Sequence, residues 1–169
     1  MEFSTAISRK TSISGETSSR IAAFLDAHHV MSLATCGPHG PHAANVFYVR
    51  DGFALFWVSD PNSRHSVELK ANGRIAATIA PDYHDFGEVC GLQICGDAGC
   101  VTGAAERRHA RTLLKGRYPF LNRLSDGPPA MKDAYEAAEL YRLDPHRMVI
   151  IDNRRGFGHK DTLNLKAPD

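Results

Sequence analysis

Three consecutive polar residues, Ser63, Arg64 and His65, stand where a strand-like run gives way to a helical pattern. Residues 53–59 are apolar and β-prone, and residues 60–62 have the composition of a turn. A helix N-terminus exposes unpaired backbone N–H groups and carries about half a positive charge. A hydroxyl, a guanidinium and an imidazole at that point could together bind a phosphate group.

The same residues also have a simpler explanation. A serine before a helix commonly caps it, and an arginine in a first turn is commonly solvated. The chain contains neither a Walker loop nor a GxGxxG fingerprint. Taken alone, this segment therefore leaves two interpretations open, a capped helix and an anion site.

The histidines do not have the spacing of a metal site. His39 and His42 flank a Gly-Pro turn, and His28 adjoins His29 at the end of a predicted helix. Neither pair has the i, i+4 spacing or the carboxylate companions of a catalytic zinc site. We predict no metal.

The four cysteines lack CxxC spacing and are predicted to be free thiols. Cys90, Cys95 and Cys100 follow one another at intervals of five along one predicted strand, so we expect them to be small core side chains.

Charge and composition limit the class of partner. Twenty basic and nineteen acidic side chains leave a formal charge of +1, so no overall field attracts nucleic acid or an anionic membrane. The basic stretch 107–111 lacks stacking aromatic residues and is predicted to be a solvated helix face. We expect a small-molecule substrate, with no nucleic acid and no membrane as partner.

The length and composition predict one domain. A chain of 169 residues with 43% hydrophobic side chains can form one substantial core. Residues 1–16 are rich in Ser and Thr and are expected to form a flexible arm, with a single domain over 17–165. The chain has no long apolar run, and its first twenty residues do not resemble a signal peptide, so we expect a cytoplasmic location.

Periodicity and turn signals predict the elements. Helices are expected from Thr17 to about His29, over 64–72 and over 106–118, with strands between them. Asp51-Gly52 is a strong hairpin signal. The segment 119–135 has no clear pattern. The predicted strands are 30–36, 42–50, 53–59, 74–80, 88–101 and 138–152, the first three forming a meander and the last interrupted near Pro145.

These elements predict an α+β fold, a six-stranded antiparallel sheet closed into a barrel with short peripheral helices. The glycines within 88–101 are expected to mark bulges or barrel bends.

The order of several short motifs resembles a known family. "NVFYVR", "FWVSDPNSRH" and "LQICGDA" follow one another as in the FMN-binding split β-barrel superfamily of pyridoxamine 5′-phosphate oxidase. "AANVFYV", "SRH" and "DNRRGFGHK" are similar to an uncharacterised bacterial branch of it. The resemblance covers residues 20–160 and implies FMN as cofactor.

The resemblance also implies which residues bind the cofactor. The oxidases' phosphate-binding Ser-Arg-Lys corresponds to Ser63, Arg64 and His65, so one lysine is replaced by histidine. Of a basic pair on the second strand only Arg50 is present, because the other position is Asn45. The complete set is Asn45, Val46, Arg50, Trp57, Val58, Ser59, Ser63, Arg64, His65, Gln93 and Lys160.

The family resemblance implies a homodimer with the flavin at the interface between subunits. Residues 152–160 then have two interpretations: a tail that presents Phe157 and Lys160 to the flavin across the dimer, or a tight turn that docks the C-terminus. No C-terminal segment matches the substrate-binding segment of the oxidase.

The prediction is an FMN-dependent oxidoreductase-like protein that acts on an unknown small substrate and not on vitamin B6. No residue is assigned as a general acid or base. The alternatives are a non-catalytic protein that binds flavin or another phosphate ligand, and a haem-binding split barrel.

Overall fold

The computed structural model describes residues 2–165, with side chains described for residues 15–124 and 127–165. Its helices are α1 (Glu2–Ala27), α2 (Arg64–Ala71), α3 (Ala104–Arg117) and α4 (Pro129–Ala137), with short 3-10 turns η1 (Phe86–Glu88), η2 (Pro119–Asp126) and η3 (Asn153–Arg155). Its strands are β1 (Val30–Gly37), β2 (Gly40–Phe47), β3 (Val49–Asp51), β4 (Ala54–Ser59), β5 (Arg74–Ile79), β6 (Cys90–Cys100), β7 (Glu139–Asp152) and β8 (Lys160–Asn164).

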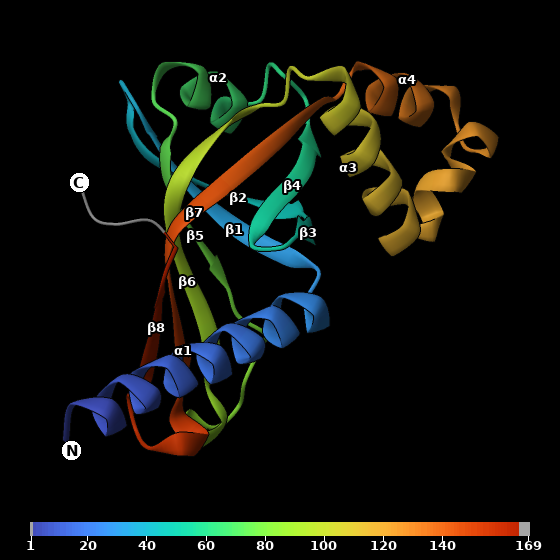
Figure 1. The fold of residues 1–169 in the computed structure, drawn as a ribbon. Helices are drawn as coiled ribbons and strands as arrows, with labels where there is room; N and C mark the ends of the chain where they lie inside the picture. The colour runs from blue at the N-terminus through green and yellow to red at the C-terminus, as the bar shows by residue number, and fades with distance from the viewer. Residues whose placement is uncertain (1, 166–169) are drawn as a thin grey trace.

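All the strands belong to one antiparallel sheet. Its order is β2-β1-β5-β6-β7-β4-β3, and β8 pairs with the lower part of β7. The two edge strands β2 and β3 are consecutive in the chain and are separated only by Tyr48. The sheet must therefore curl until its edges approach each other, which produces the partly closed barrel of Figure 1. The predicted α+β antiparallel barrel is confirmed.

Residues 2–165 contain eight strands, so the prediction of six was too low. The stretch 42–50, expected to be one strand, is divided at Tyr48 into β2 and β3, whose partners are β1 and β4. Tyr48 is fully buried and its hydroxyl donates to the backbone oxygen of Leu25, which fixes the bend between the two strands. The chain after residue 159 adds β8. The first three strands are thus not a continuous meander.

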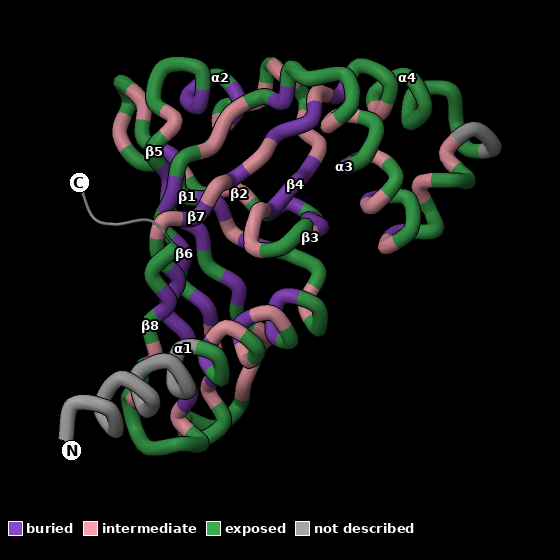
Figure 2. The backbone as a smooth tube through the Cα atoms, in the orientation of Figure 1, coloured by how far each residue is buried: buried purple, intermediate pink, exposed green. Residues whose placement is uncertain are grey.

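The core lies inside the curl. Inward-facing residues alternate with exposed ones along β5 and much of β6, as a sheet covered on one face requires. Figure 2 shows buried positions in purple along β6 and along β4. Ile21, Phe24 and Leu25 of α1 close one end of the barrel. A second apolar cluster, which includes Phe56 and Leu114, joins α3 to β4.

Helix α1 begins at Glu2, so the expected start at Thr17 was wrong. The Ser and Thr residues before Thr17 lie within the helix. Its C-terminus is fastened by Arg117 of α3, which donates to the backbone oxygens of Leu25, Asp26 and His28. A cation at a helix C-terminus is favourable because the last carbonyl groups have no partner within the helix. The division of the chain at residue 16 stays a prediction.

A bulge bends the two longest strands. The β6–β7 register shifts between Cys95 and Gly96, as the glycines had predicted, and β7 continues through Pro145. A Cβ atom at Gly96 would lie 2.3 Å from the backbone oxygen of Asp144, so only glycine fits. Cys90 is buried as expected. Cys95 and Cys100 are exposed, so their prediction as core residues was wrong; Cys95 lies on the outward face of the sheet.

Three further features of the described residues concern membranes, thiols and metals. No helix within residues 2–165 has the length and apolar character needed to cross a bilayer. The four cysteines are all free. Within the described part of the chain no group of three or more His, Cys, Asp or Glu is arranged to hold a metal ion.

Candidate functional site

Helix α2 begins as predicted, but its first residues do not make the expected cap. Ser63 occupies the N-cap position with extended backbone angles, and its side chain makes no hydrogen bond to a backbone N–H. Its hydroxyl instead donates to Ser66 at 2.9 Å and lies 3.2 Å from Nε2 of His65. The capped-helix interpretation therefore fails for the Ser63 side chain, and the first backbone N–H groups of α2 receive no hydroxyl from it.

His65 lies at the centre of a cluster of hydroxyl groups. Its Nε2 atom is 2.9 Å from the hydroxyl of Ser59, at the end of β4, in addition to its contact with Ser63. Burial lowers the pKa of His65, the nearby His42 lowers it further, and Glu68 opposes the change. The ring is thus neutral at physiological pH.

The cluster opens into a hollow of about 340 Å³ between β2, β4, α3 and η2. Its polar lining residues are Asn45, Ser59 and His65. Its apolar lining is made by Val46, Phe47, Val58, Leu114, Tyr118, Phe120 and Leu121. Such a site suits a ligand with a polar or anionic end and a flat apolar body.

Three aromatic rings form the apolar wall. The centroids of Phe47 and Tyr118 lie 5.3 Å apart, and those of Tyr118 and Phe120 lie 5.9 Å apart. Phe47 and Phe120 are 53% and 43% exposed, so their faces are available to a ligand. Tyr118 is buried and its hydroxyl donates to the backbone oxygen of Tyr48, which holds the wall against the bend between β2 and β3.

Arg64 points away from this hollow, toward the hairpin between β1 and β2. Its Nε donates to Oε1 of Glu68 at 2.8 Å, and an Nη atom lies 3.2 Å from the backbone oxygen of Gly40. The hydroxyl of Thr35 donates to the other Glu68 oxygen at 2.6 Å. The hydrogen bonds from Thr35 and Arg64 lower the pKa of Glu68. Gly37 is required beside this carboxylate, because a Cβ there would lie 2.6 Å from Cγ of Glu68.

The other predicted residues divide into two groups. Asn45, Val46 and Val58 line the hollow, and Asn45 also accepts a hydrogen bond from Ser32 at 2.6 Å. The remaining four predicted side chains lie elsewhere in the subunit. Arg50 binds Asp26 through two hydrogen bonds, and Trp57 is fully buried and stacks on Tyr141. Gln93 is exposed on the outward face of the sheet, and Lys160 is exposed at the start of β8. Neither Arg50 nor Trp57 lines this hollow. The role of these four residues as cofactor contacts stays a prediction.

Sequence reasoning missed the aromatic wall. Phe47 lies two residues after Asn45 on the same strand face, so alternation could have identified it. Tyr118 and Phe120 lie at the end of α3 and in η2, where the sequence has no clear periodic pattern. Only folding brings these rings to Phe47.

Residues 152–160 form the tight turn of the second interpretation within this subunit. Asp152 accepts hydrogen bonds from Arg20 at 3.1 Å and from Arg154 at 2.8 Å. Its backbone N–H donates to the oxygen of His159, and Gly156 and Gly158 adopt positive φ angles of 133° and 73°. The turn lies at the end of the molecule near α1, whereas α2 and α3 lie at the opposite end (Figure 1). Phe157 and Lys160 therefore do not reach the hollow of their own subunit.

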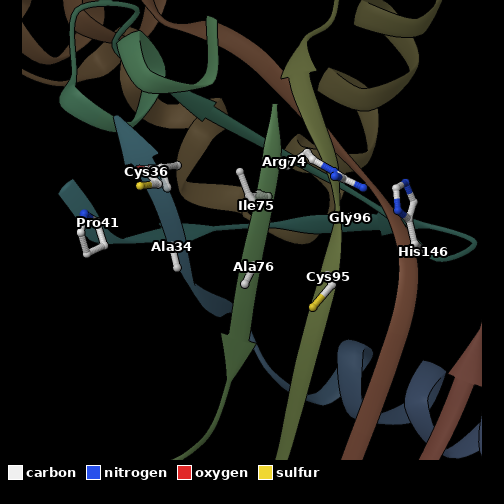
Figure 3. Close-up of a pocket in the computed structure, with 10 residues that line it drawn as sticks. Ala34, Cys36, Pro41, Arg74, Ile75, Ala76, Cys95, Gly96 and His146 are labelled. Carbon is white, nitrogen blue, oxygen red and sulfur yellow. The ribbon is translucent and has the colours of Figure 1, made fainter. Parts of the chain in front are cut away.

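A second hollow, of about 390 Å³, lies on the outward face of the sheet. In Figure 3 the small side chains Ala34, Ala76 and Cys95 are side by side on β1, β5 and β6, with Arg74 and His146 at one end. None of the predicted site residues lines it. Its shallow floor of small side chains resembles an uncovered packing surface more than a ligand site.

The arrangement of the sheet and the hollow can be compared with known proteins. Residues 17–151 match the family model described as pyridoxamine 5′-phosphate oxidase. The chain belongs to this family. It is 30% identical over 147 residues to a UPF0306 protein of Serratia proteamaculans, and the match covers 86% of this chain and 93% of that relative.

Solved structures with this fold include a conserved hypothetical protein, Rv2991, from Mycobacterium tuberculosis. It superposes with a TM-score of 0.65 at 23% identity and covers 81% of this chain and 85% of its own. A heme binding protein from Mycobacterium smegmatis superposes with a TM-score of 0.62 at 22% identity and covers 81% of this chain and 53% of its own. At these identities the likeness extends to the fold alone.

Proposed function

We propose that this chain is an FMN-binding, oxidoreductase-like protein that acts on a small substrate. The observation that carries the proposal is the hollow whose lining combines Ser59 and His65, the latter in contact with Ser63, with the aromatic wall of Phe47, Tyr118 and Phe120. FMN has the matching chemistry, a phosphate at one end and a planar ring system at the other.

The residues fit the two ends of the cofactor differently. The Ser59 and Ser63 hydroxyls and the α2 N-terminus would hold the phosphate, with Asn45 as a further polar group. The aromatic wall would exclude water from the ring system. A bound flavin would supply hydride or single-electron transfer. The contribution of the protein is to bind and orient it, and none of these residues is assigned as a general acid or base.

We also propose that the protein is a homodimer through the outward face of the sheet. Ala43, Ala34, Ala76 and Cys95 form a continuous exposed row across four strands, and the structure of one subunit covers none of them. Gln93, which is exposed on the same face of the sheet, would then lie within the interface.

Titration with FMN tests the proposed function directly. The purified protein is titrated while flavin fluorescence and the visible spectrum are followed, with riboflavin and inorganic phosphate as comparison ligands. We expect quenching at micromolar FMN, and loss of affinity in a Ser59→Ala, Ser63→Ala double variant that keeps its circular dichroism spectrum. A protein that binds none of the three ligands would contradict the proposal.

A second titration separates an enzyme from a binding protein. If NAD(P)H reduces the bound flavin and an added acceptor reoxidises it, the protein is an oxidoreductase. Tight binding without reduction would instead favour the non-catalytic flavin- or phosphate-binding protein.

Haem is the second candidate ligand, and one observation favours it. His65 presents a neutral, half-buried imidazole at the edge of an aromatic hollow, which is the form of histidine that binds iron. Addition of haemin should then produce a Soret band that His65→Ala shifts or abolishes. A spectrum identical in both proteins would remove His65 as a haem ligand.

The four free cysteines support a cytoplasmic location, because thiols persist in a reducing compartment. Fractionation of cells that express the protein would test the proposed cytoplasmic location.

A further inference from the structure

Among the described residues that line the hollow, His65 is the only one whose side chain can carry a positive charge. The other lining residues are Asn45, Ser59, Tyr118 and six apolar residues. The charged and titratable groups around the imidazole are His42 on β2 and Glu68 and Arg64 on α2, with Tyr118 also in the lining of the hollow. A ligand anion in the hollow therefore has one possible cationic partner within the lining.

The neighbouring guanidinium does not supply that charge. Arg64 is paired with Glu68, and Thr35 holds the second oxygen of the same carboxylate. The pair is neutral as a unit and faces the β1–β2 hairpin. At neutral pH the polar lining of the hollow thus presents hydroxyls, an amide and an uncharged imidazole, which bind a dianionic phosphate more weakly than a cation does.

Protonation of His65 would change the donors available to a ligand. In the neutral ring, Nε2 can accept a hydrogen bond from the hydroxyl of Ser59, whereas the Ser63 hydroxyl donates to Ser66. In the imidazolium, Nε2 is a donor, so the Ser59 oxygen accepts from it and the Ser59 hydroxyl hydrogen is free to turn toward an anion. One added proton thus supplies a charge and releases one hydroxyl donor at the same place.

We infer that the hollow binds a phosphate monoester together with one proton, which is held by His65. This inference rests on the proposed function, because FMN is the phosphate ligand considered. His65 is then the specificity-determining residue that couples phosphate affinity to pH. A lysine at the same position, as in the Ser-Arg-Lys pattern of the related oxidases, would bind the phosphate without this coupling.

The direction of the pH dependence follows from linkage. Burial holds the pKa of His65 below its ordinary value in the free protein, and a bound phosphate dianion must raise it. Affinity for FMN therefore rises as pH falls from 8 toward the free-state pKa, by at most about tenfold per pH unit for one proton. Above the bound-state pKa the effect disappears, and near pH 6 protonation of the phosphate itself begins to weaken it.

The experiment compares FMN with riboflavin between pH 6 and 8. Flavin fluorescence gives each affinity, and calorimetry in two buffers of different ionisation enthalpy gives the number of protons taken up. We expect FMN affinity to rise at least about fivefold between pH 8 and pH 6.5, with close to one proton bound at pH 7.5. Riboflavin, which lacks the phosphate, should show neither effect.

Three variants assign the proton to His65. His65→Lys should bind FMN at pH 8 at least as tightly as the natural protein and with no pH dependence. His65→Gln should bind FMN weakly at every pH. His42→Gln, which removes the other nearby imidazole, should keep the pH dependence. Circular dichroism confirms that each variant is folded.

Three results would overturn the inference. If FMN binds with the same affinity from pH 6 to 8, or if the pH dependence follows His42 in place of His65, the coupling is wrong while the proposed function stands. If neither FMN nor riboflavin binds at any pH, the proposed function fails and this inference fails with it.

Discussion

The guanidinium of Arg64 donates to the carboxylate of Glu68 one helical turn later, at 2.8 Å between Nε and Oε1. The two residues are adjacent on α2, yet their contact is decided by β1, because Thr35 and the absence of a side chain at Gly37 place the carboxylate there. Arg64 is therefore fixed against the β1–β2 hairpin and separated from Ser63 and His65, its neighbours in the sequence.

Replacement of Arg64 by alanine tests whether its remaining donors reach a ligand. Because the guanidinium is paired with Glu68 and faces the β1–β2 hairpin, we expect FMN affinity to change by less than about twofold; a loss of about 1.5 kcal/mol, the scale of a hydrogen bond from a charged donor, would show that Arg64 does contact the ligand. Because the change leaves Glu68 without its cation, the double variant Arg64→Ala, Glu68→Gln serves as the matched control for the charge. Equal FMN affinity in the natural protein and the double variant would show that Arg64 has only a structural role, in holding α2 to the β1–β2 hairpin.

Gly37→Ala should disturb the contacts of Glu68 with Arg64 and Thr35 from the side of β1. A methyl group 2.6 Å from Cγ of Glu68 must push the carboxylate from Thr35 or shift the hairpin, at a cost of about 1 to 3 kcal/mol in the free energy of unfolding. Urea denaturation measures this loss. Gly99→Ala is the control, since no atom lies within 4 Å of its Cβ position, and it should change stability far less.

The aromatic wall should contribute to ligand affinity more than to stability. Phe120 is 43% exposed, so Phe120→Ala removes little core packing, but it should weaken FMN binding by about 1 kcal/mol through loss of ring contact. Fluorescence titration and urea denaturation on the same sample separate the two effects. Met131→Ala, at another exposed apolar position, should leave FMN affinity unchanged. Equal affinity for the natural protein and Phe120→Ala would place the flavin elsewhere.

Asp152 should control the stability of the protein in acid. The hydrogen bond from Arg154 lowers its pKa most, with a further hydrogen bond from Arg20. Because the folded-state pKa is depressed, this stabilisation is fully present above the unfolded-state value of about 3.9 and is lost as pH falls through the folded-state pKa. Asp152→Asn should cost roughly 3 kcal/mol at pH 7 and flatten the decline in stability below pH 4.

Urea denaturation of both proteins from pH 2.5 to 7 measures this difference. Parallel pH profiles for the natural protein and Asp152→Asn would contradict the role given to Asp152.

A charge on the outward face should separate the proposed dimer. Ala76→Arg places a large cation at the centre of the exposed row, and sedimentation velocity should show a shift from dimer to monomer. Ala105→Arg, on the exposed surface of α3, is the control and should remain dimeric. A natural protein that sediments as a monomer at micromolar concentration would refute the interface.

The sequence by itself determined the local elements, because their signals are local. Alternation of apolar residues specified β5, Asp51-Gly52 specified the β3–β4 hairpin, and the polar run at Ser63 marked the start of α2. The order of these motifs was also sufficient to indicate the family, since each motif combines a turn with a strand or a helix end.

Only the tertiary structure decided which residues meet. The bend at Tyr48 sends β2 and β3 to opposite edges, and it brings Phe47 beside Tyr118 although some seventy residues separate them in the chain. Trp57 turns into the core, which a strand's alternation alone could not assign to one face. The physical reason is that local patterns set the period of an element, whereas the burial of apolar surface summed over the whole chain selects its partners and its inward face.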